Sequence, residues 1–209
     1  LFLTSNEKPT KEFLDELKNV NKKNKIHFET ADLTSEKEFK KVIKICRTKI
    51  GQINILVNSA GIFPIKFIQK STMKDFDRCF DINVRLPYAL IKEFSSQMIK
   101  KKWGRIINIV SSSAYFGVKE SVVYCASKHA LLGLSRATFN ELKEHNIRTF
   151  SISPGSMKTT MGKMSAKKSN QNYETFINPK EVAELISNLI SYNKEMVVDE
   201  VRLNRIKIE

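Results

Sequence analysis

The residues of this chain with the clearest chemical potential are Tyr124 and Lys128, which lie four positions apart. They fall in the segment SVVYCASKHALLGLSRATFNEL, residues 121–142, whose apolar pattern predicts a long helix. On a helix, residues four apart share one face. An ammonium beside a phenol favours the phenolate and lowers a pKa that is otherwise about 10, which suits proton exchange with a substrate oxygen. The alternative is a surface pair without a chemical role, because this spacing is common.

A third polar group, Ser111, lies thirteen residues before Tyr124. It follows the apolar run RIINIV, residues 105–110, which predicts a buried strand. Open α/β sheets bind their ligands at the carboxyl ends of strands. The position of Ser111 therefore favours a site over a surface pair.

Strands and helices alternate along the rest of the chain. Apolar runs predict strands at residues 1–4, 25–31, 53–57, 105–110, 147–153 and 197–203. Amphipathic segments predict helices that follow the strands: one with Pro9 in its first turn and Phe13, Leu14, Leu17 and Val20 on its apolar face, then about 35–50, 72–101, 121–144 and from about 179. Pro87 is expected to kink or divide the third of these helices, and residues 162–176 are expected to form a mobile loop over the substrate. The alternation predicts one α/β domain over residues 1–209, with a parallel sheet covered by helices on both faces.

The composition is that of an ordinary globular protein, with 41% hydrophobic and 28% charged residues. No apolar run reaches 18 residues and no signal-peptide pattern opens the chain, so we expect no membrane association. Cys46, Cys79 and Cys125 lie far apart without a CxxC pair. This spacing suggests neither a disulfide framework nor a zinc site, and we interpret the three cysteines as reduced thiols in the cytosol. The three histidines are scattered, which supports neither a metal site nor a hydrolase triad.

The net charge of +14, from 36 basic and 22 acidic residues, raises the question of a nucleic-acid or anionic partner. The lysines are dispersed along predicted helix faces, and the sequence contains neither aromatic–basic interleaving nor a recognised nucleic-acid-binding motif. A solvated lysine-rich surface is therefore favoured over nucleic-acid binding.

Ser111, Tyr124 and Lys128 at this spacing resemble the active site of the short-chain dehydrogenase/reductase family. Four further stretches resemble that family in the same order: ADL (31–33), NSAG (58–61), DINV (81–84) and PGSMKTTM (154–161). The resemblance covers nearly all of the chain. It implies a doubly wound, Rossmann-like sheet in three α/β/α layers, and an NAD(P)(H)-dependent oxidoreductase that interconverts a carbonyl and an alcohol.

The resemblance also implies catalytic roles. Tyr124 would be the acid/base, Lys128 would lower its pKa and bind the cofactor ribose, and Ser111 would hold the carbonyl oxygen. Ser111 is preferred to the two serines that follow it because its distance to Tyr124 matches the family. Asn83 would hold a water that links the lysine to bulk solvent, although a surface asparagine is the alternative.

Further residues would hold the cofactor. Asp32 and the Leu33 backbone would bind the adenine, although Asp32 is also placed to cap a helix. In NSAG, which departs from the family's commoner N-N-A-G, Asn58 would tie neighbouring strands together, and Gly61, next to Ala60, would let the backbone approach the ribose. Plain turn chemistry explains the same residues.

The second cofactor stretch follows a predicted strand. Pro154 and Gly155 end that strand, and the Met157 backbone and the Thr159 hydroxyl would hold the nicotinamide carboxamide.

The choice between the two dinucleotides depends on the residues after the first strand. NAD enzymes of this layout place an acid there, whereas a polar or basic set suits the 2′-phosphate of NADP. Ser5 and Asn6 are not acidic and Glu7 comes late. We therefore expect NADP, with NAD possible; a polar loop without cofactor contacts is the alternative.

The family's fold has one βα unit before the first element seen here, with a glycine-rich turn, T-G-x-x-x-G-x-G, that cradles the pyrophosphate at a helix N-terminus. No such pattern occurs in these 209 residues. In the strand order 3-2-1-4-5-6 that strand would lie between the strands at 1–4 and 53–57, and its removal would leave unpaired backbone groups. We therefore expect the sequence to be part of a longer protein, with a truncated, inactive relative as the alternative.

Two other classes of function remain open. One is a non-catalytic binding module that keeps the fold without the glycine turn, and the other is a basic nucleic-acid-binding protein. Family resemblance further implies a homo-oligomer, expected to be a tetramer with the helices near 88–101 and 121–144 at its interface.

Overall fold

The computed structural model describes residues 1–20 and 25–206. The chain divides into two compact units, residues 1–53 and 54–209, which are described separately. The single domain expected from the sequence stays a prediction.

The first unit is a parallel strand pair with two helices. It contains β1 (Phe2–Ser5), α1 (Lys11–Val20), β2 (His27–Thr30) and α2 (Glu36–Ile50). Pro9 was expected in the first turn of α1, but the helix begins two residues later, where the Thr10 hydroxyl accepts a hydrogen bond from the Phe13 N–H at 3.2 Å. Of the apolar face expected on α1, Leu14 and Leu17 are partly buried.

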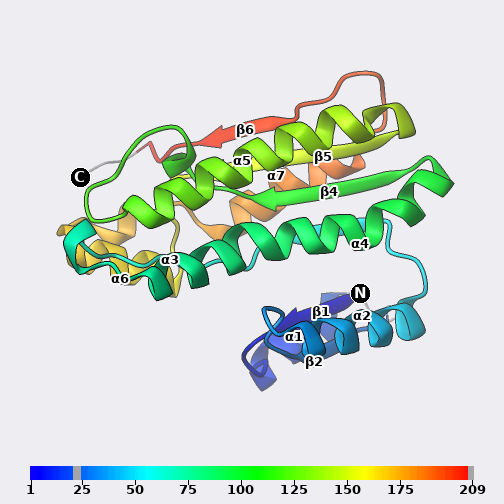
Figure 1. The fold of residues 1–209 in the computed structure, drawn as a ribbon. Coiled ribbons are helices and arrows are strands. Elements are labelled where there is room, and N and C mark those ends of the chain that lie inside the picture. Colours follow the sequence, from blue (N-terminus) through cyan, green and yellow to red (C-terminus); the bar gives the residue numbers. More distant parts are fainter. Residues whose placement is uncertain (21–24, 207–209) are drawn as a thin grey trace. The chain divides into compact units, whose positions relative to one another are not determined.

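The second unit contains a four-stranded parallel sheet in the order β3-β4-β5-β6. These strands are β3 (Ile55–Asn58), β4 (Gly104–Ile109), β5 (Ile147–Pro154) and β6 (Glu200–Leu203), and β4, β5 and β6 point the same way in Figure 1. All six strands predicted from the sequence are present, and the parallel arrangement is confirmed.

Helices cover both faces of this sheet. The helices of this unit are α3 (Met73–Phe80), α4 (Leu86–Lys101), α5 (Val122–Leu142), α6 (Thr160–Ser169) and α7 (Pro179–Ser191). Strand side chains alternate between faces: Ile107 and Ile152 pack against α7, whereas the Asn108 side chain donates to Ser135 of α5 at 2.8 Å. In Figure 1, α5 lies in front of β5 and α7 lies behind the sheet. The three-layer, Rossmann-like α/β architecture predicted from the sequence is therefore confirmed.

The helical stretch 72–101 is divided, as expected, but not at Pro87. A π-helical turn, Asp81–Arg85, separates α3 from α4. Pro87 lies in the first turn of α4, directly after this π-helical turn, and has no N–H to donate to it.

The expectation of a loop over residues 162–176 is wrong. Most of this segment belongs to α6 and to a short 3-10 helix, Tyr173–Thr175. The Thr159 hydroxyl caps α6 by accepting a hydrogen bond from the Gly162 N–H at 3.0 Å. This capping group precedes the polar segment, so the composition of the segment itself did not indicate a helix.

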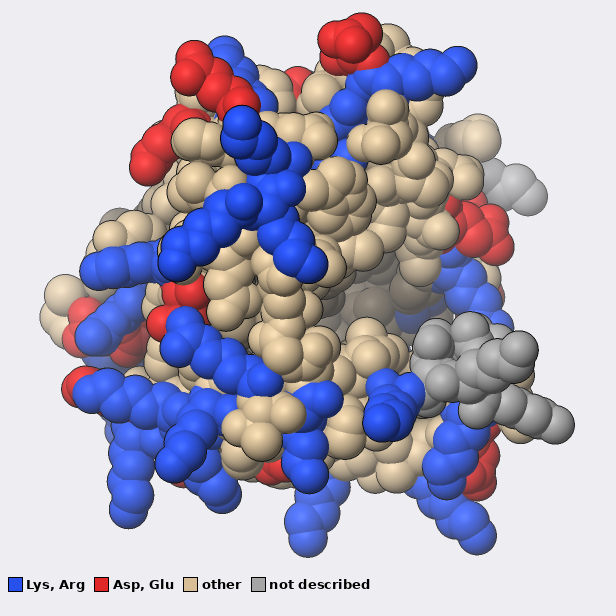
Figure 2. All heavy atoms as spheres, turned by 90° about the vertical axis from the view of Figure 1, so that its right-hand side faces the viewer, with Lys and Arg blue, Asp and Glu red and all other residues tan. Residues whose placement is uncertain are grey.

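Basic side chains are spread over the surface. Figure 2 shows Lys and Arg over much of the face drawn, with uncharged residues between them and fewer Asp and Glu. No helix in the described part of the chain is long and apolar enough to cross a membrane. The expected absence of a nucleic-acid partner stays a prediction.

Candidate active site

The site lies in the second unit, at the edge of the sheet where the carboxyl ends of its parallel strands meet. A cavity of about 1020 Å³ opens there and is lined by residues that follow all four strands. Among them are Ser59 after β3, Ser111 after β4, Gly155 after β5 and Arg205 after β6. This is the edge at which open α/β sheets bind their ligands, and the volume suits a large organic molecule.

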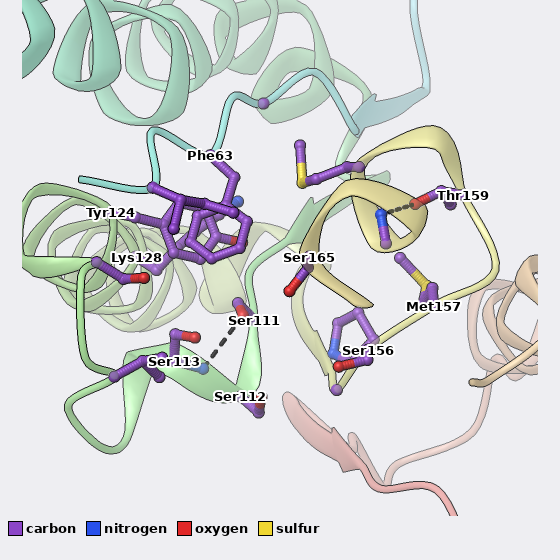
Figure 3. A pocket seen from close by; sticks show the side chains of 18 of the residues that line it. Phe63, Ser111, Ser112, Ser113, Tyr124, Lys128, Ser156, Met157, Thr159 and Ser165 are labelled. Carbon is purple, nitrogen blue, oxygen red and sulfur yellow. Dashed lines mark hydrogen bonds between the residues drawn. The ribbon is translucent and has the colours of Figure 1, made fainter. Parts of the chain in front are cut away.

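Ser111, Tyr124 and Lys128 meet at this cavity (Figure 3). Their exposed fractions are only 9%, 8% and 5%. The end of β4 positions Ser111, whose hydroxyl accepts a hydrogen bond from the Ser113 N–H at 3.1 Å. Helix α5 presents Tyr124 and Lys128 one turn apart, and the lysine ammonium donates to the Ile109 carbonyl at 2.9 Å. The structure thus brings together the three residues that the sequence singled out.

The electrostatics of this group differ from the expectation. Burial raises the pKa of Tyr124 to about 12, although a hydrogen bond with Ser111 acts in the opposite direction. Burial also lowers the pKa of Lys128 to about 8. The lysine Nζ lies 5.8 Å from the centroid of the tyrosine ring and is directed at the Ile109 carbonyl. The pKa of Tyr124 is therefore raised rather than lowered, because desolvation dominates; the expectation that Lys128 favours the phenolate stays a prediction.

Asn83 is fully buried in the π-helical turn rather than exposed on a helix surface. Its carbonyl oxygen accepts from the Ile62 N–H at 2.9 Å, and its amide donates to the Ile62 carbonyl at 3.0 Å and to the Ser127 hydroxyl at 3.0 Å. The Cys79 sulfur lies 3.3 Å from the same amide nitrogen. π-Helical turns often occur at functional sites. Here the turn lets Asn83 fix the backbone beside Gly61.

Gly61 lies beside Lys128 at a position where an added side chain would be crowded. A Cβ at this position would lie 3.3 Å from the Asn83 carbonyl oxygen and 3.7 Å from the Lys128 ammonium. The absent side chain leaves room for a ligand to approach both groups. Asn58, three residues earlier, donates to the Asn108 side chain at 2.7 Å and so joins β3 to β4. Ala60 lies between the two in the same turn.

The stretch after β5 forms the opposite wall of the cavity, with Pro154, Gly155, Met157 and Thr159 in its lining. The Gly155 N–H donates to the Leu203 carbonyl at 2.8 Å, which ties this wall to β6. Because the Thr159 hydroxyl accepts the capping hydrogen bond of α6, its own proton remains free to donate.

Four of the candidate cofactor residues belong to the first unit. Ser5 ends β1 and Asn6 follows it, both exposed. The Asp32 carboxylate accepts from the Thr34 N–H at 3.0 Å, and Leu33 lies between them. The alternative that Asp32 caps α2 is wrong, because Ser35 is the capping residue.

The sequence analysis missed several residues of the site. The Phe63 ring packs against Tyr124 with centroids 4.3 Å apart, and Ser127 and Cys79 hold Asn83 from α5 and α3. Arg205 lines the cavity after β6. Of these residues, only Cys79 could have been found from the sequence, because it lies four positions before Asn83 on a predicted helix. Phe63, Ser127 and Arg205 reach the site only through the fold.

The residues fit the nicotinamide end of a dinucleotide, since Gly61 leaves open space beside the Lys128 ammonium and the 154–159 wall faces Ser111 across the cavity. Lys128 would hold ribose hydroxyls, and Met157 and Thr159 would hold the carboxamide. The described residues contain no group of three or more His, Cys, Asp or Glu side chains placed to hold a metal ion.

Comparison with known proteins bears on the family. An oxidoreductase of Escherichia coli K12, YgcW, is 35% identical over 148 residues, which is 70% of this chain and 57% of that protein. The 3-oxoacyl-[acyl-carrier-protein] reductase of Aquifex aeolicus is 28% identical over 183 residues, or 85% of this chain and 74% of the relative. The chain thus spans little more than half the length of the first of these relatives.

Among solved structures, a 4-hydroxyisoleucine dehydrogenase complexed with NADH and succinate superposes with a TM-score of 0.80 at 27% identity. The match covers 97% of this chain and 85% of that one. The sequence profile of the short chain dehydrogenases matches residues 1–170, which include Ser111, Tyr124 and Lys128. With the fold and this site, that match establishes that the chain belongs to the short chain dehydrogenase family.

Proposed function

We propose that the native protein is an NAD(P)(H)-dependent oxidoreductase that interconverts a carbonyl and an alcohol. One observation carries the proposal: Ser111, Tyr124 and Lys128 are buried together at one cavity beyond the carboxyl ends of the strands. A buried serine, phenol and ammonium are the groups that carbonyl reduction needs, and a purely structural module has no use for them. Family membership and the reductase and dehydrogenase names of the relatives support the same reaction class.

In the proposed reduction, the Ser111 hydroxyl donates a hydrogen bond to the carbonyl oxygen, and the neutral Tyr124 phenol transfers its proton to that oxygen. A bound nicotinamide dinucleotide supplies the hydride. The buried Lys128 ammonium favours the phenolate that forms as the proton leaves. Asn83 holds the backbone beside Gly61, which keeps the ribose side of the cavity open. A water relay through Asn83 stays a prediction.

We propose NADP(H) as the preferred cofactor, because Ser5 and Asn6 supply no acid for a ribose diol. The related 4-hydroxyisoleucine dehydrogenase carries NADH, so NAD(H) is the alternative. We also propose the cytosol as the compartment, since the free cysteines Cys46, Cys79 and Cys125 are all buried as thiols.

Replacement of Tyr124 tests the reaction. In the native protein, Tyr124→Phe should lower kcat for carbonyl reduction by about 10²- to 10⁴-fold, because the phenol is the only proton donor assigned to the oxygen. The Kd for the dinucleotide should change by less than a few-fold, since the phenol acts only when the proton moves. The two quantities are measured by stopped-flow turnover and by fluorescence titration.

Ser111→Ala is the matched comparison and should slow turnover with little effect on cofactor binding. A Tyr124→Phe variant that keeps more than a tenth of the native turnover would exclude Tyr124 as the acid. The proposed mechanism would then be abandoned.

A further inference from the structure

The charges that line the cavity are unbalanced. Among the described residues that line it, four side chains are cationic, Lys119, Lys128, Lys168 and Arg205, and one is acidic, Glu120. That carboxylate lies 2.7 Å from the Lys168 ammonium and is therefore neutralised. Lys128 belongs to the catalytic group. Excess positive charge remains in the cavity, most of it unassigned.

Arg205 is one of the unassigned cations. It is partly buried, and its guanidinium donates to the Thr175 hydroxyl at 3.1 Å and to the Gln171 side-chain oxygen at 3.3 Å. It also lies over the Phe176 ring, 5.1 Å from the centroid. All three contacts are with uncharged groups, and no carboxylate within the described ranges forms an ion pair with it.

The Arg205 guanidinium is thus held in place by neutral groups, and no carboxylate of the described residues balances its positive charge. A guanidinium has five N–H donors, so two neutral contacts leave others free. Its planar fork matches the geometry of carboxylate and phosphate groups. Because Gln171, Thr175 and Phe176 already fix its orientation, an anion that binds there loses little entropy in ordering the side chain.

The position of Arg205 sets where the anion would lie. Arg205 lies two residues after the end of β6 and Ser111 lies two residues after the end of β4, with β5 between the two strands. Neighbouring strands are about 4.8 Å apart, so the two strands are separated by roughly 10 Å. An anion on Arg205 would therefore lie several bonds from a carbonyl held at Ser111.

Apolar side chains line the rest of the same cavity. Phe63, Ile65, Phe116, Val118 and Met161 are all part of its lining. Such groups favour a hydrocarbon segment over a polar one, because contact removes apolar surface from water. The cavity thus combines a carbonyl-binding end, an apolar wall and a cation.

We propose that Arg205 binds an anionic group, a carboxylate or a phosphate, on the substrate, which is then an acidic carbonyl compound with an apolar segment between its two functional groups. This inference rests on the proposed function and extends it to a substrate class. The same guanidinium chemistry would also accept a phosphate of the cofactor, so the test must separate the two sources.

Matched substrates provide the test. Methyl-ketone acids from 4-oxopentanoate to 8-oxononanoate are compared with their methyl esters in the native protein with NADPH. At the best chain length the acid should have a KM at least tenfold below that of its ester. Arg205→Gln should raise the KM of the acid at least tenfold, leave that of the ester within twofold, and leave the KM of NADPH within twofold.

Two further variants serve as controls. Arg205→Lys keeps the charge and should keep much of the preference for acids, which guards against misfolding of the glutamine variant. Arg202 is the exposed residue of β6 and lies outside the cavity lining. Arg202→Gln removes the same charge there and should change neither the KM of the acid nor that of the ester. A loss of the preference in Arg202→Gln would mean that general surface charge is responsible, and the inference would be overturned.

A binding experiment separates this inference from the proposed reaction. Octanoate, which has no carbonyl to reduce, is titrated calorimetrically into the native protein and into Arg205→Gln, and the variant should bind it at least tenfold more weakly. Arg205-dependent binding without turnover of any ketone would uphold the anion site and count against the oxidoreductase. Turnover of acids and esters with equal KM values, or a change confined to the KM of NADPH, would overturn the anion site and leave the oxidoreductase standing.

Discussion

Tyr124 is buried deeply enough that its proton is held tightly. Its pKa of about 12 keeps the phenol neutral through the physiological range, and the neutral phenol is the form that donates a proton in carbonyl reduction. Alcohol oxidation needs the phenolate instead. In the proposed reaction the site is therefore set for reduction, and oxidation must rely on the small fraction of Tyr124 that is ionised.

This asymmetry predicts different pH profiles for the two directions. Because the pKa of Tyr124 is raised, the phenolate fraction increases about tenfold per pH unit below that pKa. We expect kcat for alcohol oxidation to rise about tenfold per unit between pH 6 and 8, and kcat for carbonyl reduction to change less than twofold. Steady-state rates with saturating cofactor measure both. A plateau in oxidation below pH 8 would contradict the raised pKa of Tyr124 in the working complex.

The proposed cofactor preference also rests on single residues. Ser5 and Asn6 lie at and just after the end of β1 without a carboxylate. We expect the native protein to bind NADPH more tightly than NADH, because a 2′-phosphate meets no like charge there. Asn6→Asp should reduce this preference. Fluorescence titration of both dinucleotides measures it, and a tenfold preference of the native protein for NADH would refute the assignment.

Sequence reasoning succeeded for residues whose relation is local and failed for those joined only by the fold. Tyr124 and Lys128 are one turn apart on any helix, so their common face was predictable. The direction of the tyrosine pKa was not, since it depends on the burial that the surrounding elements impose. The position of Arg205 at the cavity could not be predicted either, because only the pairing of β5 with β6 brings this residue there.

At the scale of elements, the strands were predicted well because most contain a short apolar run, such as IINI in β4. The helix α6 was missed because its sequence, TMGKMSAKKS, is polar and its cap precedes it. Its position also depends on a close backbone approach. A Cβ on Gly162 would lie 1.9 Å from the Met157 carbonyl oxygen, which no side chain tolerates.

This contact gives a prediction for stability. Gly162→Ala should destabilise the native protein by about 2 kcal/mol or more, because the backbone at Met157 must move to relieve the overlap. Gly133→Ala is the matched control: Gly133 lies in α5 with no atom near an added Cβ, and alanine there should stabilise by about 0.5–1 kcal/mol. Urea denaturation measures both. Equal stability of Gly162→Ala and the native protein would contradict the close backbone contact between Gly162 and Met157.

At the scale of the whole molecule, the exposed faces of α4 and α5 bear on the expected oligomer. Tyr88 near the start of α4 is 51% exposed and Val122 at the start of α5 is 49% exposed. Exposed aromatic and aliphatic groups on adjacent helices suit a two-fold interface, in which the same patch meets itself. A stable interface of this type buries about 800 Å² on each partner, an area that two helices can supply.

We therefore predict that the native protein is a homotetramer whose contacts include α4 and α5. Light scattering at micromolar concentration should give four chain masses. Tyr88→Glu should shift the distribution towards smaller species, because a carboxylate inside the paired helix faces would be buried without a partner. Lys101→Glu, in the last turn of α4 and also exposed, changes the charge of the same helix far from Tyr88 and should leave the mass unchanged. A monomer under these conditions, or equal masses for the native protein and Tyr88→Glu, would show that the outer face of α4 is not an interface.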